Sequence, residues 1–166
     1  MSPSSPTEPA GLPPLPPPLW VNIESTLGCN LACRMCGSHL SGATSQRATM
    51  SDALLDQVER EVLTGALDLS LTVAGEPLLA ARLARFIDLA ERNGAQLQLN
   101  TNGTLWRDTP LLRRLLSCAS AIKFSVDAAD PDLYADIRHG ALLGEVLDNI
   151  RTVVRMRAEL PRERRP

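Results

Sequence analysis

Residues 67–100 read LDLSLTVAGEPLLAARLARFIDLAERNGAQLQLN and contain both repeating patterns of the chain. Residues 67–73 and 96–100 alternate apolar and polar side chains, which is the period of a β-strand exposed on one face. The stretch between them, residues 79–93, has the length and composition of a helix, and Gly94 follows where a helix would end. The sequence here predicts a strand, a helix and a second strand.

The same succession repeats in both directions along the chain. We expect strands at residues 21–25 and 121–127, helices at 51–63, 110–118 and 142–160, and a short helical turn that Asp130 and Pro131 open. Four such βα units predict an α/β fold with a parallel sheet and right-handed crossovers. Because the strands alternate, one face should pack on helices and the other should line a wet cavity, as in part of an open, TIM-like (β/α) barrel.

Each predicted strand leads into a loop of polar or reactive residues. The first leads to three cysteines, the second to Gly75 and Glu76, the third to Asn100 and its neighbours, and the fourth to Ser125. Ligands of parallel α/β folds bind at the carboxyl ends of the strands. We therefore expect the four loops to converge on one site.

Cys29, Cys33 and Cys36 follow the spacing C-x3-C-x2-C, which suits a small metal site. Three thiolates on a 4Fe–4S cluster leave one iron open, whereas ferredoxin-type clusters that only carry electrons use four. His39 offers an alternative, because with the cysteines it would complete a tetrahedral zinc set; incidental clustering is a third reading. Cys118 stands alone among leucines and is expected to be a small core residue.

Charge and composition exclude several classes of function. The formal net charge is −2, which provides no positive field for nucleic acid. No apolar run reaches the roughly 20 residues that span a bilayer, and the N-terminus lacks the regions of a secretion signal. Since clustered cysteines in short spacing favour metal over disulfides, we expect a reducing, cytoplasmic location.

We divide the chain into three parts by composition. Eight of the 13 prolines precede residue 19, so residues 1–19 are predicted to form an extended or disordered leader, with a proline-rich docking peptide as the alternative. We expect residues 20–160 to form the folded domain and residues 161–166 to form a solvated tail, with a binding patch as the alternative for the tail.

With these motifs in order, the sequence resembles the radical S-adenosylmethionine (radical SAM) superfamily. The resemblance begins with the cysteine loop, continues through residues 75–79, 100–104 and 124–127, and extends to Arg138 and residues 146–150. The order is similar to the peptide- and protein-modifying branch, the SPASM-type enzymes that include anaerobic sulfatase maturases. It covers residues 20–157, the N-terminal part of such a core domain. Two departures are Met35, where the family often has an aromatic residue, and Ala74, where it often has glycine.

The resemblance implies a role for each matched residue. Cys29, Cys33 and Cys36 would ligate the 4Fe–4S cluster, and S-adenosylmethionine would chelate the open iron. The cofactor would be contacted by five further residues: Gly75, Glu76, Asn100, Ser125 and Arg138. Glu76 would accept hydrogen bonds from its ammonium and Arg138 would face its carboxylate. For Asn100, a plain turn-forming role is equally consistent with the sequence.

The function implied is that of an oxidoreductase-type radical SAM enzyme. An external electron donor would reduce the cluster, and reductive cleavage would give a 5′-deoxyadenosyl radical for modification of a peptide or other substrate. The alternative is a non-catalytic zinc or iron–sulfur half-barrel that pairs with a partner protein. Four strands cannot close around a lumen, so we expect the chain alone to self-associate and to modify substrate poorly.

Overall fold

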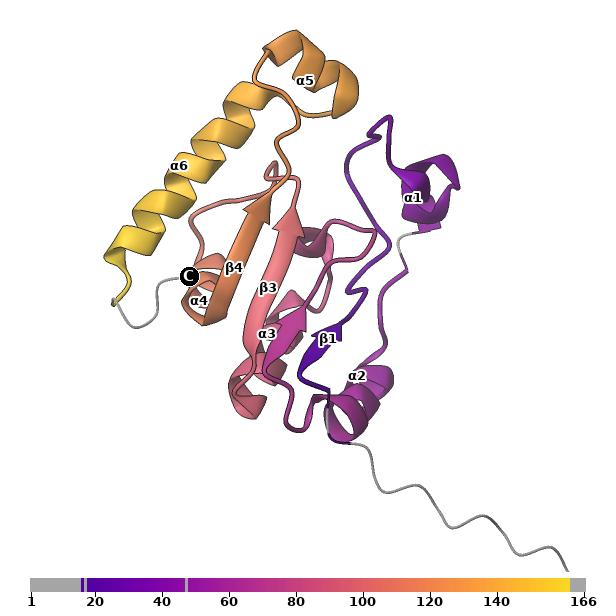
Figure 1. The fold of residues 1–166 in the computed structure, drawn as a ribbon, viewed down its shortest axis with the longest axis vertical. Coiled ribbons are helices and arrows are strands. Elements are labelled where there is room, and N and C mark those ends of the chain that lie inside the picture. Colours follow the sequence, from indigo (N-terminus) through magenta and orange to yellow (C-terminus); the bar gives the residue numbers. More distant parts are fainter. Residues whose placement is uncertain (1–15, 17, 47, 162–166) are drawn as a thin grey trace, which may run out of the picture.

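The computed structural model describes residues 16, 18–46 and 48–161. Its centre is a four-stranded sheet in the order β1-β2-β3-β4 with every pair parallel (Figure 1). The strands are β1 (Trp20–Asn22), β2 (Asp68–Ser70), β3 (Gln96–Thr101) and β4 (Ala119–Phe124). The predicted parallel α/β sheet is thus confirmed.

Helices connect the strands and follow the last of them, and most begin at a residue whose side chain caps them. They are α2 (Asp52–Val58), continued by a π-helical turn η2 (Glu59–Leu63), then α3 (Leu83–Asn93), α4 (Pro110–Cys118), α5 (Pro131–Ile137) and α6 (Leu143–Glu159). Ser51, Thr109 and Asp130 each accept a hydrogen bond from the third residue after them, as N-caps do. Gly94 ends α3 with a positive φ of 67°, a conformation that glycine adopts without strain.

The first two strands are shorter than the sequence predicts. Beyond β1, the Ser25 hydroxyl donates to the carbonyl of Leu71 at 2.9 Å, and beyond β2 the Thr72 hydroxyl donates to the carbonyl of Asn100 at 3.0 Å. Side-chain donors therefore replace the backbone ladder at the carboxyl end. The predicted fourth strand is also displaced, because β4 begins at Ala119 directly after α4 and ends at Phe124.

Two helical segments differ from the prediction. The helix expected from residue 79 begins at Leu83, because Pro77–Leu79 form a separate 3₁₀ turn, η3, in which Glu76 accepts from the amide of Leu78. The sequence analysis also missed α1 (Gly37–Leu40) and the 3₁₀ turn η1 (Ala43–Gln46), which follow the cysteines. Both are single turns, too short to show a helical period.

The two faces of the sheet differ as expected. Leu69, Leu97 and Leu99 are at most 1% exposed and pack in the main core with α3 and α4, which lie behind the sheet in Figure 1. The opposite face carries polar side chains that are exposed or half-buried, namely Asn22, Asp68, Ser70, Gln96, Gln98 and Asn100. A second, smaller core joins the cysteine loop to α5 and α6.

The predicted leader and tail fall mostly outside the described residues, namely residues 1–15, 17 and 162–166. Leu19 already belongs to the folded domain, because its carbonyl accepts hydrogen bonds from the amides of Leu67 and Asp68 at 2.9 and 3.1 Å. Across the described ranges, no helix has the length and apolar character needed to cross a membrane.

Candidate cofactor site

The cysteine loop lies at the carboxyl end of the sheet and is fixed by backbone hydrogen bonds to the chain after α5. The amide of Ala32 donates to the carbonyl of His139 at 3.0 Å, and that of Arg34 donates to Ile137 at 3.1 Å. Cys36 caps α1, where its Sγ accepts from the amide of His39 at 3.4 Å. Contacts far apart in sequence therefore determine the path of the loop.

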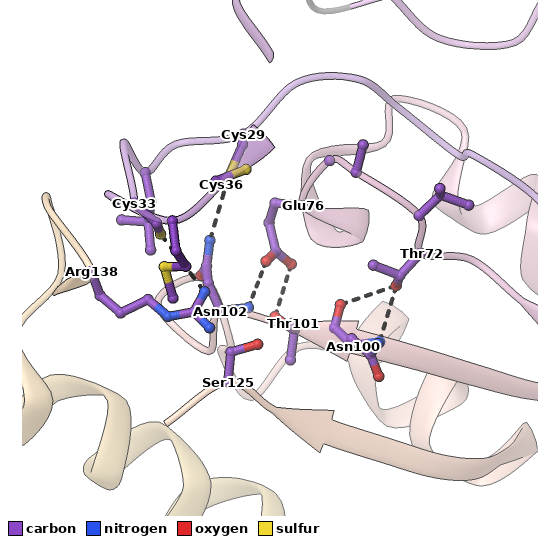
Figure 2. A pocket seen from close by; sticks show the side chains of 15 residues that line it. Cys29, Cys33, Cys36, Thr72, Glu76, Asn100, Thr101, Asn102, Ser125 and Arg138 are labelled. Atoms are coloured by element: carbon purple, nitrogen blue, oxygen red, sulfur yellow. Dashed lines mark hydrogen bonds between the residues drawn. The ribbon is translucent and has the colours of Figure 1, made fainter. Parts of the chain in front are cut away.

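A cavity of about 290 Å³ opens beside this loop, close to the roughly 300 Å³ at which small-molecule pockets begin. All eight residues that the sequence analysis assigned to the site line it: Cys29, Cys33, Cys36, Gly75, Glu76, Asn100, Ser125 and Arg138. Figure 2 shows the three thiols on one side of the cavity and Glu76 and Ser125 across from them. The strand-end loops do converge, as the parallel topology requires.

Glu76 is a buried carboxylate, only 2% exposed, held by three donors. Its Oε1 accepts from the Thr101 hydroxyl at 2.8 Å and from the Leu78 amide at 3.1 Å, while Oε2 accepts from the Asn102 amide at 2.7 Å (Figure 2). Burial raises the pKa of Glu76, and these hydrogen bonds together with the charge of Arg138 act in the opposite direction. A cation placed beside it would favour the ionised form.

Gly75 lies where the β2 loop touches the cysteine loop. A Cβ at this position would be 1.9 Å from the carbonyl oxygen of Thr26 and 2.9 Å from that of Gly28. The neighbouring amide of Glu76 donates to Gly28 at 2.8 Å, and the Glu24 carboxylate accepts from the amide of Ala74 at 2.6 Å. Only glycine allows this approach, which brings Glu76 towards the cysteines.

Arg138 is the C-cap residue of α5, whereas the other cofactor-binding candidates lie at the carboxyl ends of strands or on the loops that follow them. Its Nε donates to the Asp127 carboxylate, and its Nη1 lies 3.7 Å from Cys33 Sγ. Burial disfavours the charged guanidinium, but the hydrogen bond and charge of Asp127 outweigh burial and raise the pKa of Arg138. The site therefore holds a permanent positive charge next to the thiols.

Sequence reasoning missed four residues of the site. Thr101 and Asn102 bind Glu76, Asp127 orients Arg138, and Tyr134 is fully buried with its hydroxyl unpartnered among the described residues. The Oδ1 of Asn102 accepts from the Thr104 amide at 2.9 Å, as in a turn, and its Nδ2 also lies 3.9 Å from Cys29 Sγ. The motif order was the only sequence signal for these contacts.

The zinc alternative receives no geometric support. His39 lines a second hollow together with Cys29 and His139, whereas neither Cys33 nor Cys36 lines that hollow. Throughout the part of the chain that the structure describes, no three cysteine, histidine or carboxylate side chains are gathered closely enough for a single metal ion. A four-iron cluster places each thiolate on a different iron, so its three thiols need not converge on a single metal ion.

Comparison with known proteins agrees with this geometry. A family model described as the radical SAM superfamily matches residues 23–158. An S-adenosylmethionine-dependent nucleotide dehydratase of Selenomonas ruminantium is 27% identical over 112 residues, covering 67% of this chain and 40% of that protein. A 7-carboxy-7-deazaguanine synthase of Halobacterium salinarum is 32% identical over 118 residues, 67% of this chain and 42% of that protein.

Among solved structures, Streptococcus suis SuiB shares the fold. In its S-adenosylmethionine complex, the TM-score is 0.60 at 17% identity, with 84% of this chain and 32% of that chain covered. Its complex with the precursor peptide SuiA gives a TM-score of 0.58 at 16% identity, covering 84% of this chain and 31% of that one. The chain spans about 40% of the length of the curated relatives named above.

Proposed function

The chain belongs to the radical SAM superfamily, whose cofactors are a 4Fe–4S cluster and S-adenosylmethionine, and from this premise we propose that Cys29, Cys33 and Cys36 ligate its cluster. The observation that carries the proposal is the cavity in which three thiols, a buried carboxylate and a guanidinium meet. The chemistry supplied by the bound cofactors is one-electron reduction of the sulfonium, giving methionine and a 5′-deoxyadenosyl radical that abstracts hydrogen from a substrate.

The chain's own residues would bind and orient the cofactor. Glu76 Oε2 accepts one hydrogen bond in the structure, so it can accept another from the cofactor's ammonium. Arg138 faces the carboxylate while Asp127 holds its guanidinium in place. Ser125 and Asn100 border the same cavity and contact the remaining polar groups, and the backbone of Gly75 also lines it.

We further propose that the substrate is a peptide or protein, as in the sulfatase maturase-like branch, and that an external donor reduces the cluster in the cytoplasm. The SuiB complex with a precursor peptide supports the peptide proposal. A second candidate is a nucleotide-type substrate, because the names of two curated relatives describe a nucleotide dehydratase and a deazaguanine synthase. Activity assays with both substrate classes would separate them.

Metal analysis tests the cluster assignment. When the chain is purified and reconstituted without oxygen, it should be brown and should contain about four irons per chain with a matching amount of sulfide. Cys33→Ser should lose iron, whereas Cys118→Ser, which changes a thiol outside the cavity, should keep it. Stoichiometric zinc without sulfide would instead support the non-catalytic zinc module.

Cofactor affinity tests the role of Glu76. Glu76→Gln removes the charge and keeps Oε1 as acceptor for Thr101 and Leu78, although its NH2 group cannot accept from the Asn102 amide. Iron content should stay and S-adenosylmethionine should bind about tenfold or more weakly. Glu145→Gln, an exposed change on α6, is the matched control. Calorimetric titration that gives equal affinities for the two variants would refute the assignment.

A further inference from the structure

Lys123 is the only lysine in a chain whose other sixteen basic residues are arginine. It lies on β4 opposite Asn100 of β3 in the parallel register. Ile122 and Phe124, its neighbours along the strand, pack against the main core, whereas Lys123 is exposed. Side chains of a strand alternate between faces, so Lys123 lies on the polar face, the face of Asn100 and Ser125.

The ammonium of Lys123 has no partner within the described ranges, where it makes neither a hydrogen bond nor a salt bridge. The carboxylates near this face make their contacts with other groups. Asp68 accepts from Gln98 at 2.9 Å, and Glu24 accepts from the amides of Ala74 and Gly75 at 2.6 and 3.3 Å. Asp127, beyond the end of β4, is paired with Arg138. Lys123 is therefore a positive charge on the polar face without an ion-pair partner among the described residues.

This charge lies directly beside the cofactor cavity. Ser125, two residues further along the chain, lines the cavity, and so does Asn100, the registered neighbour of Lys123 on β3. Two residues along a strand correspond to roughly 7 Å. The Asn100 side chain has no hydrogen-bond partner of its own among the described residues, since its contacts with Thr72 use backbone atoms (Figure 2). Asn100 therefore both lines the cavity and lies beside Lys123 in the sheet register.

We propose that Lys123, next to the cofactor-contacting Asn100, forms an anion subsite that binds a phosphate or carboxylate group of the substrate. The assignment of this anion to the substrate rests on the proposed function, because the reacting carbon must lie at the cofactor. If the substrate's anion binds Lys123, the substrate atoms roughly 7 Å from that anion would lie beside the cavity, since Ser125 lines the cavity two residues further along the chain. The ammonium supplies three donors and a full charge, the pairing that phosphate and carboxylate groups favour.

The single lysine makes this subsite directly observable. The full chain, carrying a tag without lysine, is produced with lysine labelled with ¹³C and ¹⁵N, reconstituted without oxygen, and titrated with inorganic phosphate, acetate or chloride at equal ionic strength. We expect the one lysine side-chain resonance to shift saturably with phosphate or with acetate but not with chloride. If only one of the two anions shifts the resonance, the subsite binds that class of group, either phosphate or carboxylate.

Variants establish that the response arises at this site. In the variants, anion binding is followed through the resonance of the Ser125 backbone amide. Lys123→Met should weaken binding of the active anion about tenfold, and Lys123→Arg should largely retain it. Arg60→Met removes an exposed charge from η2 and should leave it unchanged. Equal weakening by Lys123→Met and Arg60→Met would overturn the proposal, as would a lysine shift that chloride reproduces.

Cofactor binding is measured on the same samples, so the two proposals fail separately. If S-adenosylmethionine binds normally and the lysine resonance ignores phosphate and acetate, the anion subsite alone is wrong. If the resonance responds but the cofactor does not bind, the proposed function fails, and the subsite stands as an anion site without a place in that reaction.

Discussion

At the scale of single residues, Gly75 has the tightest steric constraint in the site. Gly75→Ala should separate the β2 loop from the cysteine loop, cost about 1–3 kcal/mol of unfolding free energy as overpacking does, and weaken cofactor binding by displacing Glu76. Gly144→Ala, on α6 with no atom within 4 Å of the new methyl, should not destabilise the protein. Denaturant unfolding and calorimetric titration measure both effects, and equal stability of the two variants would contradict this reading.

Cys118 allows a second test at this scale. Burial raises the pKa of its thiol to about 11 from 9.0, and its Sγ donates to the Leu115 carbonyl at 3.3 Å. The folded protein holds this proton more tightly than the unfolded chain, so the group stabilises the fold below pH 9 and that contribution is lost as pH rises towards 11. At pH 8, iodoacetamide should modify Cys118 slowly, and faster in urea. Peptide mass mapping that finds no change in urea would refute this.

At the scale of elements, the end of α5 positions both the cysteine loop and Arg138. Asp130 caps it, with Oδ1 accepting from the Leu133 amide at 2.9 Å. Asp130→Ala should cost about 1 kcal/mol of unfolding free energy, whereas Asp130→Asn should retain most of it, because asparagine caps as well as aspartate. The alanine variant should also bind S-adenosylmethionine more weakly, since the end of α5 holds the cysteine loop through Ile137 and His139. Denaturant titration and calorimetry check both expectations.

At the scale of the whole molecule, β1 and β4 each have one edge unpaired within the described ranges. Beside β4, mainly apolar residues of α4, β4 and α6 line a groove of about 330 Å³, namely Leu116, Ala121, Ile122, Phe124, Ile150, Val153 and Val154, together with Arg157. An open edge next to an apolar groove favours association between chains. This geometry supports the expectation from the sequence that the isolated chain self-associates.

Val154→Glu should therefore increase the monomer fraction of the chain in solution. Leu142→Glu is the matched control, because both side chains are 59% exposed but Leu142 lies away from the groove. Sedimentation equilibrium over a range of concentrations measures the effect. A wild-type chain that stays monomeric throughout would refute the expectation.

Several features of the fold could be predicted from the sequence because they depend on local periodicity. Alternation of apolar and polar residues identified all four strands, and the predicted bounds of α4 were those observed. Pro110, Asp130 and Gly94 marked helix ends through their own backbone and capping chemistry. Strand ends could not be predicted, because the Ser25 and Thr72 hydroxyls replace backbone partners on neighbouring strands.

For the site, the sequence determined which reactive residues meet, since parallel strands place their carboxyl-end loops together. The tertiary structure alone decided how they are held. Thr101 and Asn102 satisfy a buried carboxylate from another loop, and Asp127 fixes Arg138 eleven residues away. Such contacts join segments distant along the chain, and their strength comes from burial, which exists only once the chain has folded. Local pattern therefore determined the architecture and the candidate residues, whereas the electrostatics of the site arose from packing.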